Sequence, residues 1–249
     1  MNILKKLFLL CLVSVLTLMV NAETFVVAVG VANYKNISKL VLSENDAKTI
    51  AKLYKTKTRN VITMTGRYAT RVNIIKAMSD QFRRARKGDM VVLFFSGHGY
   101  EGGFCPYDMG HDYSNALSYD DIYAVFRKSN AFRKVIIADA CMSGGLRQEQ
   151  RSGNSSSPNA SDVVMFLSSR TNEYSIENTR MDNGFFTEYL EKGLRGGADV
   201  NRDRVITAKE LFNFVSKGVK DLSRNRQHPV MWGNFDDNFI MIDWRKSKR

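Results

Sequence analysis

Short apolar runs alternate with helix-like segments along this chain, and this alternation constrains the fold more than any other feature. Six runs are typical of strands, and the run at 89–97 is apolar almost throughout, as strands covered on both faces are. The strand-like runs cover residues 24–34, 60–65, 89–97, 134–139, 161–169 and 238–243. The helix-like segments cover residues 44–54, 70–85, 118–128, 184–194 and 207–222. The order predicts an α/β fold with a mostly parallel central sheet, closed by 238–243, and helices on both faces.

The first 22 residues are typical of a secretory leader rather than of that fold. Lys5 and Lys6 precede an apolar run that ends at Val20, and small residues follow up to Ala22. The alternative is an uncleaved membrane anchor, which the shortness of the run disfavours. We therefore expect a signal peptide over 1–22, export to the periplasm or the medium, and one domain over 23–249 without a membrane span.

Charge and cysteine content exclude some classes of function. The formal net charge is +12, but the basic residues cluster only weakly, as at 83–87 and 245–249, which suits a helix face and a tail. Nucleic acid is therefore not an expected partner, and we expect a monomer.

Cys105 and Cys141 remain after the leader. A Cys105–Cys141 bridge stays open as an alternative to a reactive thiol, although two cysteines form no disulfide framework.

Two of the expected strands end in residues that are typical of nucleophilic catalysis. "SGHG" presents His98 after one strand, and "DACMSGG" presents Cys141 after the next. A thiol becomes a good nucleophile only beside a base or a cation, and neighbouring parallel strands bring their carboxyl ends together. The adjacent glycines let backbone N–H groups approach a developing oxyanion. His98 alone would suggest a structural histidine, but its pairing with Cys141 favours catalysis.

"FFSGHG" and "IIADACMSGG" resemble the caspase-like cysteine peptidases, most of all the metacaspases and their bacterial relatives. The resemblance covers nearly the whole mature chain and implies a caspase-like three-layer sandwich that hydrolyses peptide bonds and needs no cofactor for its chemistry. By motif, Cys141 is the nucleophile and His98 is the acid/base that protonates the leaving amine. The backbone N–H groups of Gly99 and Cys141 would form the oxyanion hole. Met142 stands where metacaspases commonly carry histidine, and we expect activity to survive that departure.

Three further residues indicate which substrates such a site would take. Asp139, two positions before Cys141, would favour a cationic side chain before the cut. The resemblance assigns Asp46 of "SENDAK" and Ser96 of "SGHG" to the same pocket, which implies peptide or protein substrates cut after Arg or Lys. Asp46 could instead cap the helix over 46–54. The polar loop 147–160 follows the nucleophile and contains arginines, so we also expect self-cleavage there.

Residues 199–210, "DVNRDRVITAKE", have the spacing of an EF-hand calcium loop. The oxygen ligands would be Asp199, Asn201, Asp203, the Val205 carbonyl, Thr207 and Glu210. Arg204 stands where such loops carry glycine, so the turn there costs conformational energy. The alternative is a charged loop that caps the helix over 207–222. We expect Ca²⁺ as an optional cofactor.

A second calcium site is implied by the resemblance to metacaspases. Asp108, Asp120 and Asp121 fit three positions of an acidic cluster in that family, and Gln148 stands where the fourth acid would be. Asp120 and Asp121 could instead be acids of the first turn of a helix.

Two other functions stay open from the sequence. The chain could be a catalytically silent binding or scaffold protein with the same fold, or a peptidase that resembles clostripain and the gingipains.

Overall fold

The structure is a computed structural model, and it describes residues 22–100, 102–140, 163–169, 181–233 and 238–245. Most of the expected leader, the expected nucleophile Cys141 and the loop 147–160 lie outside these residues. In the part of the chain that is described, no helix is long and apolar enough to span a membrane.

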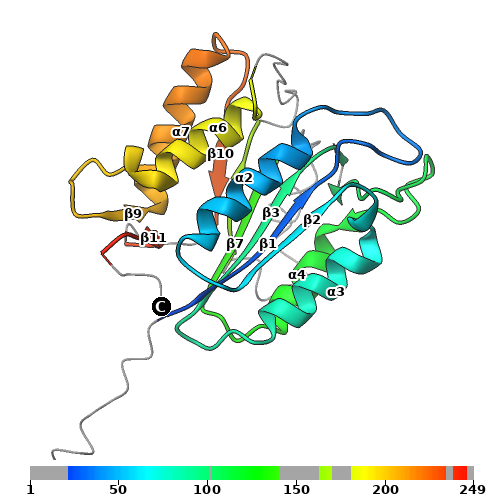
Figure 1. Cartoon of the computed structure of the whole chain (residues 1–249), viewed down its shortest axis with the longest axis horizontal. Helices are drawn as coiled ribbons and strands as arrows, with labels where there is room; N and C mark the ends of the chain where they lie inside the picture. The colour runs from blue at the N-terminus through cyan, green and yellow to red at the C-terminus, as the bar shows by residue number, and fades with distance from the viewer. Residues whose placement is uncertain (1–21, 101, 141–162, 170–180, 234–237, 246–249) are drawn as a thin grey trace, which may run out of the picture.

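A six-stranded sheet forms the centre of the molecule, with the strands in the order β10-β8-β7-β3-β1-β2 (Figure 1). Neighbouring strands run parallel, except that β10 is antiparallel to β8. The strands are β1 (Thr24–Gly30), β2 (Val61–Thr65), β3 (Met90–Ser96), β7 (Arg133–Asp139), β8 (Val163–Leu167) and β10 (Val230–Trp232). From β1 the chain moves to β2 on one side and then to β3 on the other. The carboxyl ends of β1 and β3 therefore meet at a topological switch point, where α/β sheets bind ligands.

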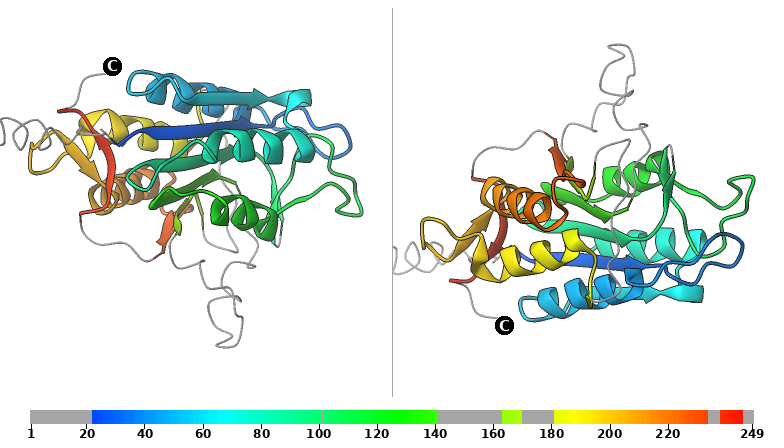
Figure 2. Two further views of the ribbon diagram at one scale, coloured as in Figure 1. Left: turned by 90° about the horizontal axis from the view of Figure 1, so that it is seen from below. Right: turned by 90° about the horizontal axis from the view of Figure 1, so that it is seen from above.

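Helices cover both faces of this sheet. The view from below has α3 and α4 in front of the sheet, and the view from above has α2, α6 and α7 (Figure 2). The helices are α2 (Ser43–Lys55), α3 (Arg71–Phe82), α4 (Tyr119–Arg127), α6 (Phe185–Lys192) and α7 (Ala208–Leu222).

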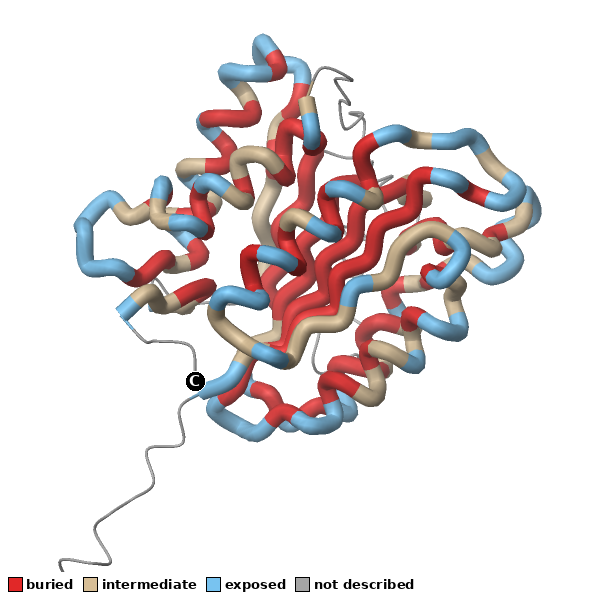
Figure 3. Tube along the Cα trace, in the orientation of Figure 1, coloured by how far each residue is buried: buried red, intermediate tan, exposed pale blue. Residues whose placement is uncertain are grey.

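Alternation along the strands explains the two layers of helices. In β1, Val27 and Val29 pack in the core beneath α3 and α4, whereas Val26 and Ala28 pack in the core beneath α2, α6 and α7. β3 and β8 are buried along their whole length, and β1 and β7 are buried except at their first residues (Figure 3). The expected three-layer α/β fold with a mostly parallel sheet is confirmed.

Two small sheets were not expected. β4 (Gly99–Tyr100), β5 (Gly103–Phe104) and β6 (Leu117–Ser118) form one of them, directly after β3. β9 (Val205–Thr207) and β11 (Ile240–Asp243) form the other. The expectation that 238–243 closes the central sheet was therefore wrong: β11 pairs with β9, and β10 takes the edge position beside β8. A 3₁₀ turn over Gly66–Tyr68 and a π-helical turn over Gly193–Gly197 complete the regular structure of the described residues.

Candidate active site

The register of β3 and β7 defines the edge of the sheet at which the candidate site lies. Ser96 and Asp139, the last residues of the two strands, are directly opposite each other. The Gly97 N–H donates to the Asp139 carbonyl at 3.1 Å, so the pairing continues one step beyond β3. His98 follows Ser96 by two positions, and Cys141 follows Asp139 by two positions. Cys141 lies outside the described residues. Its position relative to the end of β7 is the same as that of His98 relative to the end of β3, which supports the expected Cys–His dyad.

The imidazole of His98 is held by the backbone of a loop that follows β1. Its Nε2 lies 3.0 Å from the Ser38 carbonyl oxygen and 3.2 Å from the Ser38 hydroxyl. Because a carbonyl oxygen can only accept, we assign the ring proton to Nε2. Nδ1 is then the ring nitrogen that can accept a proton, and the Ser38 carbonyl stabilises the imidazolium that results.

Tyr34 fixes the backbone on which His98 sits. The His98 N–H donates to the Tyr34 hydroxyl at 2.6 Å, and the two rings lie 5.0 Å apart between centroids. Gly97 has φ +156°, and a Cβ there would lie 2.4 Å from the Tyr34 hydroxyl. Only glycine permits this approach. Gly99, the expected oxyanion donor, begins β4 and is paired opposite Phe104.

Asp46, Ser96 and Asp139, the three residues expected in the substrate pocket, lie together at this edge. Asp46 and Asp139 are only 2% and 7% exposed. The Ser96 hydroxyl donates to Asp46 Oδ2 at 2.7 Å. The alternative role of Asp46 as a helix cap is not observed, because α2 begins at Ser43 with Leu42 at the N-cap.

The N-terminus of α6 binds both carboxylates. The N–H of Gly184, the N-cap residue, donates to Asp46 Oδ1 at 3.0 Å. Thr187 donates to Asp139 Oδ2 twice, from its backbone at 3.2 Å and from its hydroxyl at 2.8 Å. A Cβ on Gly184 would lie 2.7 Å from Asp139 Oδ2 and 3.5 Å from Asp46 Oδ2, so the two carboxylates flank this glycine. The positive end of the α6 dipole stabilises their negative charge.

Ser168 anchors Ala140, the residue that precedes Cys141. Its hydroxyl accepts the Ala140 N–H at 3.1 Å and donates to the Ala140 carbonyl at 3.1 Å. Gln227 donates to the Ser168 carbonyl at 2.9 Å. Ser168 and Gln227 are both fully buried. This network holds the end of β7 at the point where the chain reaches Cys141.

Cys105 is a free, buried cysteine in the core under α3 and α4. Burial raises the pKa of its thiol to about 12, because the thiolate is poorly solvated there. Cys105 is therefore a structural residue, and the bridge to Cys141 is not formed.

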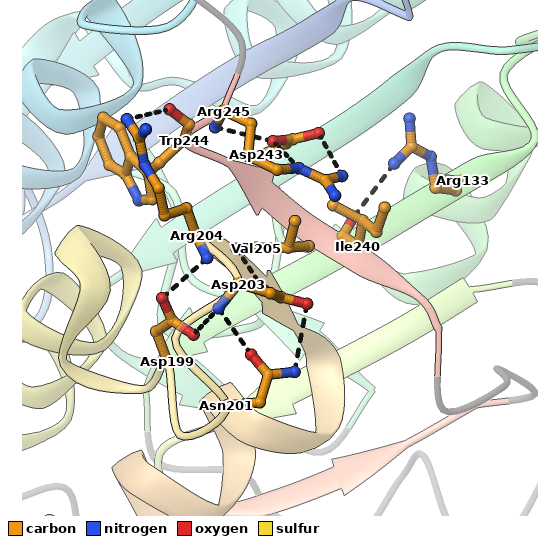
Figure 4. A network of polar contacts seen from close by, with 10 residues as sticks. All are labelled: Arg133, Asp199, Asn201, Asp203, Arg204, Val205, Ile240, Asp243, Trp244 and Arg245. Carbon is orange, nitrogen blue, oxygen red and sulfur yellow. Dashed lines mark hydrogen bonds and ion pairs between the residues drawn. The ribbon is translucent and has the colours of Figure 1, made fainter.

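The loop 199–210 links the π-helical turn after α6 to α7, and its oxygens are turned toward its own backbone (Figure 4). The Asp199 carboxylate accepts the N–H groups of Asp203 and Arg204 at 3.1 and 3.0 Å. Asn201 Oδ1 accepts the Asp203 N–H at 2.9 Å, and Asp203 Oδ1 accepts the Val205 N–H at 2.8 Å.

The same loop shows the features that argued for and against calcium. Arg204 adopts φ 66°, so it makes the turn that favours glycine, and Ile206 is fully buried in the core. Thr207 and Glu210 form a capping box at the start of α7, which is the alternative role that the sequence allowed. Within the described residues, no three histidine, cysteine or acidic side chains gather as a metal-binding group.

Arg71 occupies the second acidic cluster. Its guanidinium binds Asp121 through two hydrogen bonds of 3.1 and 2.7 Å, and its backbone N–H donates to Asp108 at 3.0 Å. Asp121 also forms a capping box with Ser118 at the start of α4, and Asp120 is exposed beside it. Although burial opposes it, bonding to Arg71 and Ser118 holds the pKa of the Asp121 carboxyl below its usual range.

Comparison with known families agrees with this geometry. A family model described as "Caspase domain" matches residues 24–240. The chain belongs to the caspase-domain family.

Solved structures share the caspase-like fold at low sequence identity. Protein GSU0716 from Geobacter sulfurreducens is 19% identical, with a TM-score of 0.65 over 91% of this chain and 100% of that one. Caspase-1 from Spodoptera frugiperda is 15% identical, with a TM-score of 0.62 over 88% of each chain. No curated protein matches this chain significantly. The caspase domain supports a cysteine peptidase, and hence a hydrolase, in a family that also has inactive members.

Sequence reasoning missed Ser38, Tyr34, Ser168, Gly184 and Thr187. Ser38 acts through a carbonyl that any residue carries, and the other four act on partners far away in the sequence. The only available signal was the glycine of the "GFFT" that opens α6, because glycine is one of the residues favoured at a helix N-cap.

Proposed function

We propose that this chain is a cysteine endopeptidase that cuts after Arg or Lys. The observation that carries the proposal is the pair of buried carboxylates, Asp46 and Asp139, at the strand edge that also bears His98. Neutral hydroxyl and amide groups hold both carboxylates. A guanidinium or ammonium group from the substrate would add a full positive charge to the partial charges of these donors.

In the proposed mechanism, Nδ1 of His98 takes the proton of the Cys141 thiol, and the thiolate attacks the scissile carbonyl. The N–H groups of Gly99 and Cys141 stabilise the oxyanion. His98, held as an imidazolium by the Ser38 carbonyl, then gives its proton to the leaving amine. Water hydrolyses the thioester, releases the carboxylate and returns the proton to the dyad. Self-cleavage after Arg147 or Arg151 would follow the same steps.

We further propose that any bound Ca²⁺ lies in the loop 199–210. The loop offers the carboxylate and amide oxygens that calcium prefers, and Arg204 adopts the turn conformation that such loops need. The cluster of Asp108, Asp120 and Asp121 is the weaker of the two proposed sites, because the Arg71 guanidinium already neutralises Asp121. Calcium in the loop would fix the start of α7 rather than take part in the chemistry.

A panel of fluorogenic peptides that differ only at the residue before the cut, with and without calcium, tests the function. We expect turnover of Arg and Lys peptides and none of Asp peptides. A preference for Asp or apolar residues would contradict the acidic pocket. A thiol-directed activity probe tests the silent alternative: a silent scaffold leaves Cys141 unlabelled, whereas a peptidase of either kind is labelled.

A further inference from the structure

The buried carboxylate of Asp89 binds the backbone nitrogen of Glu23, the first residue after the expected leader. The Glu23 N–H donates to Asp89 Oδ1 at 2.7 Å. Asp89 precedes β3 and is only 3% exposed. Its other oxygen, Oδ2, accepts the Arg86 N–H at 2.7 Å. The carboxylate is thus fixed in its own turn and directed at the first residue of the expected mature chain.

Glu23 is itself held in place at three points. Besides its bond to Asp89, its carbonyl accepts the Met90 N–H at 2.9 Å, and its side-chain Oε2 accepts Nδ2 of Asn60 at 2.6 Å. Ala22 and Glu23 are exposed and precede the first residue of β1. Removal of the residues before Glu23 therefore leaves every described helix and strand intact, and the nitrogen of Glu23 stays against Asp89.

We propose that Asp89 is the receptor for the α-ammonium group that forms when the bond between Ala22 and Glu23 is hydrolysed. In this step water adds to the Ala22 carbonyl and the C–N bond breaks. Ala22 leaves as a carboxylate, and the nitrogen of Glu23 takes up both protons of the water to become an ammonium group. A neutral N–H donor to Asp89 is thereby replaced by a cationic one, and the hydrogen bond becomes a charge-assisted ion pair.

Other charged groups face this pair from the neighbouring elements. Arg133 of β7 donates to the Gly88 carbonyl at 3.2 Å and interacts with Asp89 electrostatically. Arg84 binds Asn60 at 2.9 Å and lies over the Phe25 ring, and the side chain of Glu23 adds a second carboxylate. The two carboxylates favour the ammonium form, whereas the two arginines oppose it. Asp89 lies in direct contact with the nitrogen, so its effect is the largest.

This arrangement determines how the folding stability of the mature chain changes with pH. The carboxylate stabilises the charged amine, so the pKa of the α-amino group is higher in the folded chain than its ordinary value of about 8. A raised folded pKa gives stability that is fully present below about pH 8 and is lost as the pH rises through the folded pKa.

The first measurement is the intact mass of the full chain after export, and we expect a chain that begins at Glu23. The second compares two preparations of that mature chain, one with a free amine and one acetylated at Glu23. Acetylation restores a neutral amide N–H at the same atom, so only the charge differs. Below pH 8 the free form should melt about 2–8 °C higher. This difference in melting temperature should disappear at alkaline pH and in the Asp89→Asn variant.

Two controls keep the outcome decisive. Glu23→Gln keeps the α-amino group and should keep this difference in melting temperature. If Asp89→Asn does not fold, titration of a ¹⁵N-labelled Glu23 amine in the wild-type protein replaces it, and its pKa should lie above the ordinary value. A mature chain that begins at another residue, equal melting of the free and acetylated forms, or an amine with an ordinary pKa would overturn the proposal. None of these outcomes depends on peptidase activity.

Discussion

Thr187→Val tests whether the N-terminus of α6 sets the specificity of the acidic pocket. Valine has nearly the shape of threonine, so the change removes the hydroxyl donor to Asp139 and leaves the backbone donor in place. Thr187 is fully buried, so water does not replace the lost bond. A hydrogen bond to a charged group contributes about 1.5–3 kcal/mol, which corresponds to about a 10- to 150-fold effect at about 1.4 kcal/mol per factor of ten.

The assay measures kcat/KM on two peptides that carry arginine or its neutral analogue citrulline before the cut. If Thr187 orients the carboxylate that binds the guanidinium, Thr187→Val lowers kcat/KM for the arginine peptide by about 10- to 150-fold. The same change should have little effect on kcat/KM for the citrulline peptide. A general packing defect would lower both rates equally. Thr187→Ser keeps the hydroxyl and should restore the ratio of the two rates.

Asp139→Asn is the reference for complete loss of the charge. The reasoning is refuted if Thr187→Val keeps the wild-type arginine-to-citrulline ratio while Asp139→Asn abolishes it. It is also refuted if Thr187→Ser is as damaging as Thr187→Val, since the hydroxyl would then have no specific role.

Four other substitutions probe the remaining parts of the site and the calcium loop. Cys141→Ala and His98→Ala should each abolish peptide turnover with little change in melting temperature; wild-type turnover in either would disprove the dyad. Ser168→Ala removes both side-chain bonds to Ala140 and should lower kcat about 10-fold or more, as steady-state kinetics on the best peptide would show. Glu210→Gln should reduce the rise in melting temperature that calcium causes, with little effect on the saturated rate. If a chelator leaves the wild-type melting curve unchanged, the loop does not bind calcium.

The layers of the fold were predictable because they depend on the spacing of apolar residues along the strands and helices. Strands β1 and β3 are long enough to show their apolar character, and α2 and α7 carry clear apolar faces. β10 was missed because three residues are too few to establish a period. β11 has an ordinary strand pattern, but nothing in its sequence states that its partner is β9 rather than the central sheet.

The candidate site was predictable only where it is carried by motifs. His98 and Asp139 lie in short signatures at strand ends. The residues that hold them do not: Ser38 contributes a carbonyl from a loop, and Thr187 reaches Asp139 across 48 positions of sequence. Hydrogen bonds of this kind become visible only when the fold has brought the two elements together.

Asp121 differs from Asp46 and Asp139 in the donors that surround it. Asp121 has a guanidinium of the chain itself, Arg71, in a two-point contact. Asp46 and Asp139 accept hydrogen bonds from hydroxyls and from the start of α6, whose positive end favours negative charge. A metal ion at Asp121 would have to displace Arg71, and this cost weakens the acidic cluster as a calcium site. A basic side chain of the substrate beside Asp46 and Asp139 would add a full positive charge to the partial charges of these donors.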